Sequence, residues 1–432
     1  MSTVVLRWVC LGAVLAMGGC GDDSADDGTA DATVDLDANA TDADATTPMM
    51  DASLVDGDAD IPDAAPPPDP VYVACGGTFA PGGASGFVIG FTSLAAASLD
   101  LGASIEVPGG ANCVVGDGVV YVGQAESPTL TRYEVGEDGT LTEGLSVSFA
   151  GLGIANLGGF PNQFLLISPT KACFLDVQTA SVVIWNPSTM EIVDDFPLDG
   201  LGSFIRVEGF AASDRFIVYT RNATGTGLTE QRTGIAFVDT TTDTAVFDES
   251  TTCGGISSAV ELPSGEVFLA SNNISAAEHR LGTPGSFPPC YIRIPPGAQA
   301  IDDAFSLNAN DLTGGPTGGL VPGPGTSGFV QGYDETIVPI DPMGSGRDVQ
   351  ASPAWRLYRI PEVGTTMPGV VVDAVPPAAG GIFHFVIDDR IYLSRLAADF
   401  SRATLFDITD APATITESVS AGGFLLLVDR VR

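Results

Sequence analysis

From about residue 71 to the end of the chain, short apolar or alternating runs of five to eight residues recur, separated by Gly, Pro, Asp, Asn and Ser. Apolar spacing of the helical kind, sustained over eleven or more residues, is nearly absent. Alternation and short apolar runs bounded by turn residues are typical of β-strands with one or both faces buried. The pattern therefore predicts an all-β domain.

The runs fall into groups of four. Six groups span residues 112–149, 163–197, 207–248, 257–307, 328–374 and 381–419. Three further runs within residues 71–107 and a single run at 423–431 together make a seventh group. A period near fifty residues with four strands per period is typical of a β-propeller. We expect a single propeller of seven four-stranded blades, closed by the C-terminal strand, which becomes the inner strand of the N-terminal blade.

Two alternatives to this ring stay open, a stacked array of β-sandwiches and a propeller of six or eight blades. The C-terminal run FLLLV at residues 424–428 favours closure, because an apolar strand left as an open edge promotes aggregation. Residues 181–185, SVVIW, are apolar on both faces, as expected for a strand enclosed between blades. In the group at 328–374 the predicted strands are residues 328–331, 335–340, 355–360 and 369–374.

The N-terminal pattern is that of a bacterial secretory signal. Arg7 precedes an apolar stretch at residues 8–17, and two glycines stand directly before Cys20. The last four residues, MGGC, resemble a lipobox, with Met17 where leucine is usual. Residues 1–19 are predicted to be a lipoprotein signal peptide and Cys20 the acylated new N-terminus. The alternative is a plain signal cleaved near Gly19 without lipid.

Residues 20–70 differ in composition from the rest of the chain. Between residues 21 and 70 there are fifteen aspartates and no lysine, arginine or glutamate. High charge with almost nothing to bury cannot offset the ordering entropy, so a disordered acidic tether is predicted. The run at residues 56–60, DGDAD, lacks the glycine and glutamate of a calcium loop, which favours a solvated spacer. Residues 71–432 are then the propeller.

The net charge is −37, of which the tether supplies −15, so the folded part is also acidic. Nucleic acid is excluded as a partner on this ground, because phosphate binding needs a basic surface. Acidity is compatible with cationic ligands, although solubility of an exported domain explains it equally well.

Five cysteines lie in the predicted propeller, namely Cys75, Cys113, Cys173, Cys253 and Cys290. The number is odd, so at least one is unpaired or forms an intermolecular bond. In an oxidising compartment we expect a disulfide between Cys253 and Cys290.

Candidate catalytic chemistry is sparse. The chain has two histidines: His384, predicted in a strand as a core or channel residue, and His279, predicted in an exposed loop. No G-x-S-x-G, H-E-x-x-H, P-loop or dinucleotide motif occurs. No catalytic residue, metal ligand or cofactor is therefore predicted, and a non-catalytic role is favoured. The alternative is a propeller hydrolase of the lactonase kind, using a carboxylate-bound metal at the channel mouth.

Loop lengths point to one face of the ring. The connection from second to third strand is long in three consecutive groups, at residues 220–232, 271–289 and 341–354. Long loops in a compact domain are usually functional, although tolerated insertion is an equal alternative. Polar residues near the ends of the second strands are the ligand-binding candidates: Gln124, Glu126, Arg221, Asn272, Asp341 and Arg395. Their mixed charges suit a polar small molecule or a peptide rather than a lipid.

Three segments carry a family resemblance: residues 127–133 (SPTLTRY), 168–172 (SPTKA) and 185–190 (WNPSTM). They resemble segments of myxobacterial propeller lipoproteins, some of them MxcI-like and linked by gene neighbourhood to siderophore production, within the YncE/lactonase-like seven-bladed superfamily. The resemblance implies a binding or protein-interaction module of the bacterial cell envelope, with iron-siderophore handling as its expected role. We expect the protein to be a monomer. Its partners would be the lipid bilayer, through acylated Cys20 at the outer membrane, and a small polar ligand or an envelope protein.

Overall fold

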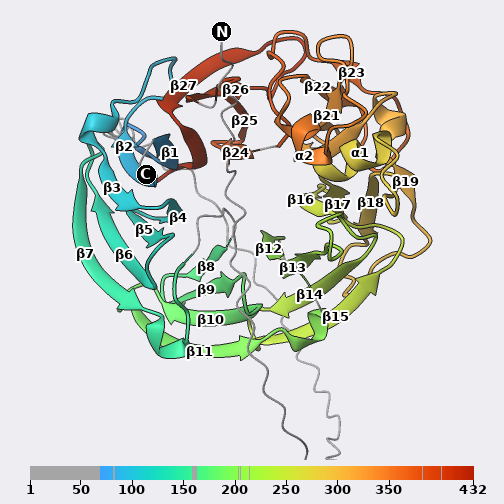
Figure 1. Cartoon of the computed structure of the whole chain (residues 1–432). Helices are drawn as coiled ribbons and strands as arrows, with labels where there is room; N and C mark the ends of the chain where they lie inside the picture. The colour runs from blue at the N-terminus through green and yellow to red at the C-terminus, as the bar shows by residue number, and fades with distance from the viewer. Residues whose placement is uncertain are drawn as a thin grey trace, which may run out of the picture. The chain divides into compact units, whose positions relative to one another are not determined.

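The computed structural model describes residues 69–432 apart from 81–82, 158–162, 203, 205, 214, 382 and 400. This part of the chain forms seven four-stranded antiparallel sheets arranged as blades around a ring (Figure 1). The structure confirms the predicted seven-bladed β-propeller. The predicted signal peptide, Cys20 and nearly all of the acidic tether lie outside the described residues.

The blades are numbered in chain order, and each is given from its inner to its outer strand. Blade 1 comprises β28 (Phe424–Arg430), β1 (Tyr72–Ala80), β2 (Gly83–Phe91) and β3 (Ile105–Pro108). Blade 2 comprises β4 (Ala111–Gly116), β5 (Val119–Gln124), β6 (Thr129–Val135) and β7 (Leu141–Ser148). Blade 3 comprises β8 (Phe164–Ser168), β9 (Lys171–Asp176), β10 (Ser181–Asn186) and β11 (Glu191–Pro197). Blade 4 comprises β12 (Arg206–Ala211), β13 (Phe216–Arg221), β14 (Thr233–Asp239) and β15 (Thr244–Ser250).

Blade 5 comprises β16 (Ile256–Glu261), β17 (Val267–Ser271), β18 (Cys290–Ile294) and β19 (Leu307–Asn308). Blade 6 comprises β20 (Thr317–Pro322), β21 (Gly328–Tyr333), β22 (Trp355–Ile360) and β23 (Val370–Val371). Blade 7 comprises β24 (Phe383–Ile387), β25 (Arg390–Leu396), β26 (Arg402–Asp407) and β27 (Thr416–Gly422). The helices are α1 (Asn273–Arg280), α2 (Gly346–Ala351) and the short 3-10 turns η1 (Leu101–Ala103), η2 (Ala150–Leu152), η3 (Asp199–Leu201) and η4 (Ala309–Leu312).

The ring closes as predicted, because β28 pairs antiparallel with β1 and becomes the inner strand of blade 1. Two further links fasten the closure. A disulfide joins Cys75 of β1 to Cys113 of β4, and therefore blade 1 to blade 2. On the other side, the backbone N–H of Leu99, in the β2–β3 connection, donates to the carbonyl of Ser420 on β27 at 2.8 Å. Blade 1 is thus joined to blade 2 by a disulfide and to blade 7 by a backbone hydrogen bond.

The hydrophobic core is divided among the interfaces between blades. Each pair of neighbouring blades shares one cluster of buried apolar side chains. Strand β10 shows how one strand serves two clusters: Val183 and Trp185 pack towards blade 2, whereas Val182 and Ile184 pack towards blade 4. This explains the run that is apolar on both faces, since alternate side chains of a middle strand point to opposite sides of its sheet.

Blade 6 differs from the sequence prediction. Its first strand, β20, was missed, residues 328–331 belong to the second strand rather than the first, and residues 335–340 are not a strand. The sequence of β20 is TGGLVP, and two adjacent glycines are more typical of a loop than of a strand. A Cβ on Gly318 would lie 2.7 Å from the backbone of Asn272, so glycine is required there by the close approach of blade 5.

Candidate functional site

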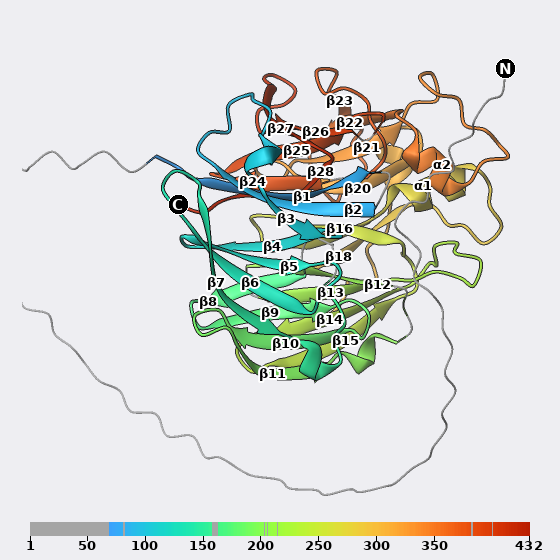
Figure 2. The ribbon, with the colours of Figure 1, turned by 60° about the vertical axis from the view of Figure 1, so that its left-hand side comes forward.

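The long connections of blades 4, 5 and 6 lie on one face of the propeller and are built around the two helices. Helix α1 follows β17, and α2 lies between β21 and β22. Each has a side-chain cap, since the Asn272 carboxamide oxygen accepts from Ser275 N–H and Ser345 forms a capping box with Asp348. The helices pack side by side (Figure 2) over the buried, edge-to-face pair Tyr333 and Trp355.

A buried polar network joins the blade 4 connection to α1. The Glu278 carboxylate, 7% exposed, accepts from the backbone N–H of Thr229 at 3.2 Å and from its hydroxyl at 2.6 Å. The Ser275 hydroxyl contacts both Thr229 Oγ1 at 3.1 Å and the Asn272 carboxamide oxygen at 3.2 Å. Burial raises the pKa of Glu278, an effect opposed by the Thr229 hydrogen bonds and the nearby charge of Arg347 on α2.

The same network continues across blades 5, 6 and 7. The Asn273 amide nitrogen donates to the Gln331 side-chain oxygen at 3.1 Å. Gln331, fully buried on β21, also accepts from Gly381 N–H at 3.0 Å and donates to the Gly381 carbonyl at 3.3 Å. We call the set Thr229, Asn272, Asn273, Ser275, Glu278 and Gln331 the rim network.

Two asparagines at this face have unmet hydrogen-bonding groups among the described residues. Asn222 is 1% exposed, and neither its amide nitrogen nor its oxygen has a partner; Asn272 is 4% exposed, and its amide nitrogen has none. Each asparagine directly follows the second strand of its blade, β13 or β17. Buried amides are normally satisfied, so these groups mark a place where water or a ligand completes the bonding.

Asn272 and Arg221, the residue before Asn222, both contact the backbone where β16 begins. The backbone N–H of Asn272 donates to the Gly255 carbonyl at 2.8 Å, and Arg221, the neighbour of Asn222, reaches the Ile256 carbonyl at 3.5 Å. Cys253 forms a disulfide with Cys290, the pair expected from the sequence. Cys173 is the remaining cysteine of the described part and is buried and unpaired.

The predicted ligand residues of blades 4 and 5 lie at this site. Arg221 forms an ion pair with Glu208 of the inner strand β12 at 3.7 Å, and Tyr219 also donates to Glu208 at 3.3 Å. Asn272 is the N-cap of α1 and a member of the rim network.

The four other predicted ligand residues lie outside this site. Gln124 is half-buried and Glu126 exposed, both on blade 2. Asp341 is exposed, and its carboxylate accepts from the backbone N–H of Met343 at 2.9 Å in a turn. Arg395 is buried, and its guanidinium donates to the backbone carbonyls of Trp355 at 2.6 Å and Pro376 at 3.1 Å. Its hydrogen bonds therefore hold blade 7 to blade 6, and burial lowers its pKa to about 10.

Several residues of the site were not selected from the sequence: Asn222, Thr229, Asn273, Ser275, Glu278 and Gln331. Asn222 could have been found, because it occupies the position of Asn272 in the preceding blade. The capping pattern Ser345-x-x-Asp348 also indicates a helix in the blade 6 connection. Glu278 offered no such signal, since its importance depends on a contact with a loop of another blade.

The histidines lie elsewhere. His279 lies in helix α1 and is half-buried, not in an exposed loop as predicted. His384 lies on the inner strand β24, where desolvation by the surrounding protein lowers its pKa to about 4.

Among the described residues no three His, Cys, Asp or Glu side chains lie together in a way that could hold a metal ion. In the same part of the chain no helix is long and apolar enough to cross a bilayer.

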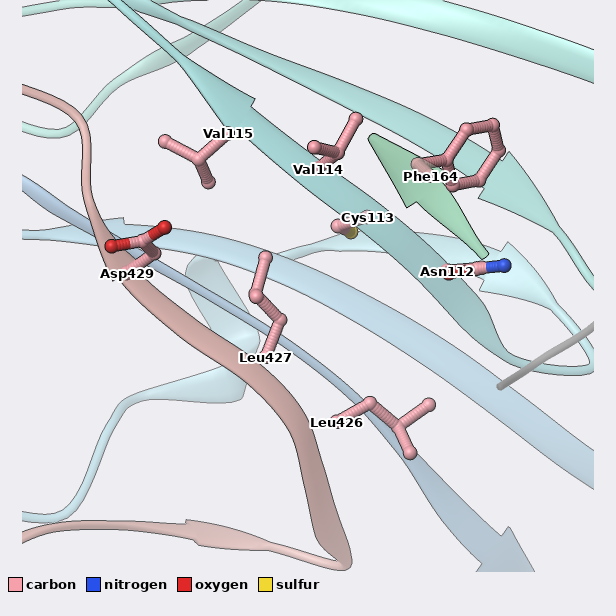
Figure 3. A pocket seen from close by; sticks show the side chains of 8 residues that line it. All are labelled: Asn112, Cys113, Val114, Val115, Phe164, Leu426, Leu427 and Asp429. Atoms are coloured by element: carbon pink, nitrogen blue, oxygen red, sulfur yellow. The ribbon is translucent and has the colours of Figure 1, made fainter. Parts of the chain in front are cut away.

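A second feature is a cavity of about 110 Å³ between the inner strands β28 and β4 (Figure 3). We call it the seam cavity. Its wall is formed by Asn112, Cys113, Val114, Val115, Phe164, Leu426, Leu427 and Asp429. Burial raises the pKa of Asp429 to about 6, and the nearby charge of Asp388 adds to this effect.

No protein-family model matches the chain, and the comparison with curated proteins gives no match either. Solved structures with a similar arrangement include a mutant of the Synechocystis apocarotenoid oxygenase, 12% identical with a TM-score of 0.44, over 84% of this chain and 93% of that chain. Apo AztD from Citrobacter koseri is 14% identical with a TM-score of 0.42, over 84% and 98%. A protein from Lactobacillus plantarum is 10% identical with a TM-score of 0.47, over 84% and 99%. Similarity at this level carries no argument about function.

The class of protein follows from the strands themselves: the described residues form a seven-bladed β-propeller. Membership of the myxobacterial lipoprotein family stays a prediction from the sequence.

Proposed function

We propose that this protein is a non-catalytic binding module of the bacterial cell envelope, lipid-anchored through Cys20 at the outer membrane, monomeric, and engaged in iron-siderophore handling. The observation that carries the binding role is the pair Asn222 and Asn272, whose buried amide nitrogens have no hydrogen-bond partner among the described residues. The iron-siderophore part rests on the resemblance to the myxobacterial propeller lipoproteins.

The rim of blades 4 to 6 suits a polar ligand. Asn222 offers both a donor and an acceptor, and Asn272 offers a donor. Arg221, the residue before Asn222, adds a charged group that pairs with Glu208 at 3.7 Å. A ligand that supplied carbonyl or hydroxyl groups here would satisfy buried amides that otherwise carry a desolvation cost, and this difference is a source of selectivity.

The rim is also rigid enough to present such groups. The two helices are capped at their N-termini, and α2 approaches α1 so closely that a Cβ on Gly346 would lie 2.7 Å from Glu278 Cγ. The disulfide between Cys253 and Cys290 fixes the segment beneath. Groups held in place before binding lose little conformational entropy when a ligand arrives.

Titration of the full chain with a ferric hydroxamate and a ferric catecholate siderophore tests the binding role. Trp355 packs beneath the helices, so its fluorescence should report occupancy of the rim. We expect saturable quenching that Asn222→Ala weakens by about tenfold, equivalent to the loss of about 1.4 kcal/mol. Gln178→Ala, an exposed side chain in the short connection of blade 3 on the same face, is the control. Absence of binding to both ferric siderophores, together with protein levels that ignore iron limitation, would refute the iron-siderophore role.

The anchor is tested separately, so that its failure and the failure of binding can be told apart. Growth with a labelled fatty acid should label the wild-type chain but not Cys20→Ala, and the wild-type chain should fractionate with the outer membrane. An unlabelled wild-type chain that fractionates as a free protein would favour the plain signal peptide over a lipoprotein signal.

A further inference from the structure

The seam cavity lies away from the rim network and has its own chemistry. Its apolar side chains are those of Val114, Val115, Phe164, Leu426 and Leu427. Two polar side chains also line it, Asn112 and Asp429, which come from the inner strands of blades 2 and 1 (Figure 3). The cavity therefore combines apolar side chains with one polar side chain from each of the inner strands β4 and β28.

Asp429 lacks a cationic partner among the described residues. Its carboxylate accepts a hydrogen bond from the backbone N–H of Arg430 at 2.8 Å. The Arg430 guanidinium is engaged elsewhere, with Asp388 at 2.7 Å, and Asp388 also accepts from the Tyr72 hydroxyl at 3.2 Å. The charged groups around Asp429 are thus already paired with one another, and a half-buried carboxylate is left facing the cavity.

Asn112 can contribute only an acceptor. Its amide nitrogen donates to the Leu157 carbonyl at 3.0 Å and to the Gln163 side-chain oxygen at 2.6 Å. An amide nitrogen carries two hydrogens, so both are used, and the carboxamide oxygen is what remains. Both polar side chains of the cavity consequently present hydrogen-bond acceptors, which favours a ligand that donates.

We infer that the seam cavity binds a small primary alkylammonium ion, with its ammonium group at the Asp429 carboxylate and its alkyl chain between Val115 and Leu427. The Asp429 carboxylate calls for a positively charged group on the ligand, and the apolar side chains of the cavity call for an alkyl chain. An engineered cavity of about 150 Å³ holds benzene, so the smaller seam cavity fits a ligand of about five non-hydrogen atoms. The n-butylammonium ion has this size and is the probe of choice.

Calorimetric titration of the full chain with n-butylammonium chloride at about pH 7.5 tests the proposal. We expect saturable binding with a dissociation constant in the millimolar range, roughly what a ligand of this size can reach. Butyrate and n-butanol, which share the alkyl chain but not the positive charge, should bind at least about tenfold more weakly. Equal binding of the three compounds, or no binding of the amine, would overturn the proposal.

Two variants separate charge from shape. Asp429→Asn keeps the size of the side chain and should weaken n-butylammonium binding by about tenfold or more, whereas Val115→Phe should abolish it by filling the slot. Glu362→Gln, an exposed carboxylate on blade 6, should bind as the wild type does. Undiminished binding by a folded Asp429→Asn protein would overturn the proposal.

The wild-type protein provides a further test that needs no variant. The amine stays protonated between about pH 5 and pH 7.5. A carboxylate with a pKa of about 6 loses most of its negative charge when the pH is lowered from about 7.5 to about 5. Binding should therefore weaken by about tenfold at the lower pH. Affinity that is independent of pH would contradict a contact with Asp429.

Discussion

The Glu278 carboxylate of helix α1 accepts from both the backbone N–H and the hydroxyl of Thr229, at 3.2 and 2.6 Å, across 49 positions of sequence. A single buried oxygen thereby holds the connection of blade 4 against the helix of blade 5. The arrangement shows that the rim is a structure shared between blades rather than a set of independent loops.

The chemistry of this contact predicts different outcomes for two substitutions. Glu278→Ala leaves the Thr229 N–H without its acceptor and should lower the free energy of unfolding by about 1–3 kcal/mol. Glu278→Gln keeps an acceptor oxygen and removes a buried charge, so it should be as stable as the wild type or more so at neutral pH. Denaturant unfolding at a series of pH values measures both.

The sign of the pH effect follows from the raised pKa of Glu278 in the folded protein. The folded state binds the proton more tightly than the unfolded state, so the stability contribution of Glu278 is lost as the pH rises through its folded-state pKa. The advantage of Glu278→Gln over the wild type should therefore grow from acid to neutral pH. An advantage that shrinks over this range would show that the hydrogen bonds outweigh burial.

Arg395 is predicted to act as a clamp, that is, to stabilise the contact between blades 6 and 7 through its hydrogen bonds to backbone carbonyls. Arg395→Met should lower the free energy of unfolding by about 2–4 kcal/mol, because it leaves the carbonyls of Trp355 and Pro376 without their donor. Arg280→Met removes an exposed pair with Glu335 and should change stability by less than about 1 kcal/mol. Similar small effects of both substitutions in chemical denaturation would contradict the clamp.

The two disulfides close loops of nearly equal length, with sequence separations of 38 and 37 residues. Replacing either pair by serine should therefore cost a similar amount, about 2–4 kcal/mol. Hydrogen exchange should distinguish them. Loss of Cys75–Cys113 should speed exchange in β1 and β28, whereas loss of Cys253–Cys290 should speed it in β16 and β18. Uniform acceleration around the ring in both variants would show that the blades do not open separately.

Asp429 should make stability depend on pH in the mildly acidic range. Its folded-state pKa is raised to about 6 by burial, so its contribution to stability is lost as the pH rises from about 4 through about 6 and is constant above that. Asp429→Asn should be more stable than the wild type by about 1–2 kcal/mol at pH 7 and equal to it at about pH 3. Thermal unfolding at the two pH values checks this, and Asp303→Asn, an exposed acid on blade 5, serves as the control.

The fold could be predicted from the sequence because propeller blades repeat a local pattern. Strand β10, for example, carries its apolar character on both faces because it contributes to two interfaces, and that character is visible in the residues themselves. The prediction failed at β20, where glycine is required by the approach of Asn272 from another blade. That requirement is tertiary, and no local pattern contains it.

The candidate site was predicted only in part for the same reason. Loop lengths indicated the face, and Arg221 and Asn272 lie where the ends of the second strands place them. Arg395 has an equivalent position in its blade, yet it turns to the backbone of blade 6. Whether a polar side chain at the end of a strand faces a ligand or a neighbouring backbone depends on packing between blades, which the chain does not encode locally.

The pairing of β1 with β28 also sets the order in which the domain can be completed. Synthesis delivers β1 long before β28, so β1 has an unpaired edge until β28 is available. Six blades can form beforehand from strands contiguous in sequence, but the ring cannot be sealed. A chain that lacked β28 would thus expose the edge of β1, where a chaperone or protease could distinguish it from the closed ring.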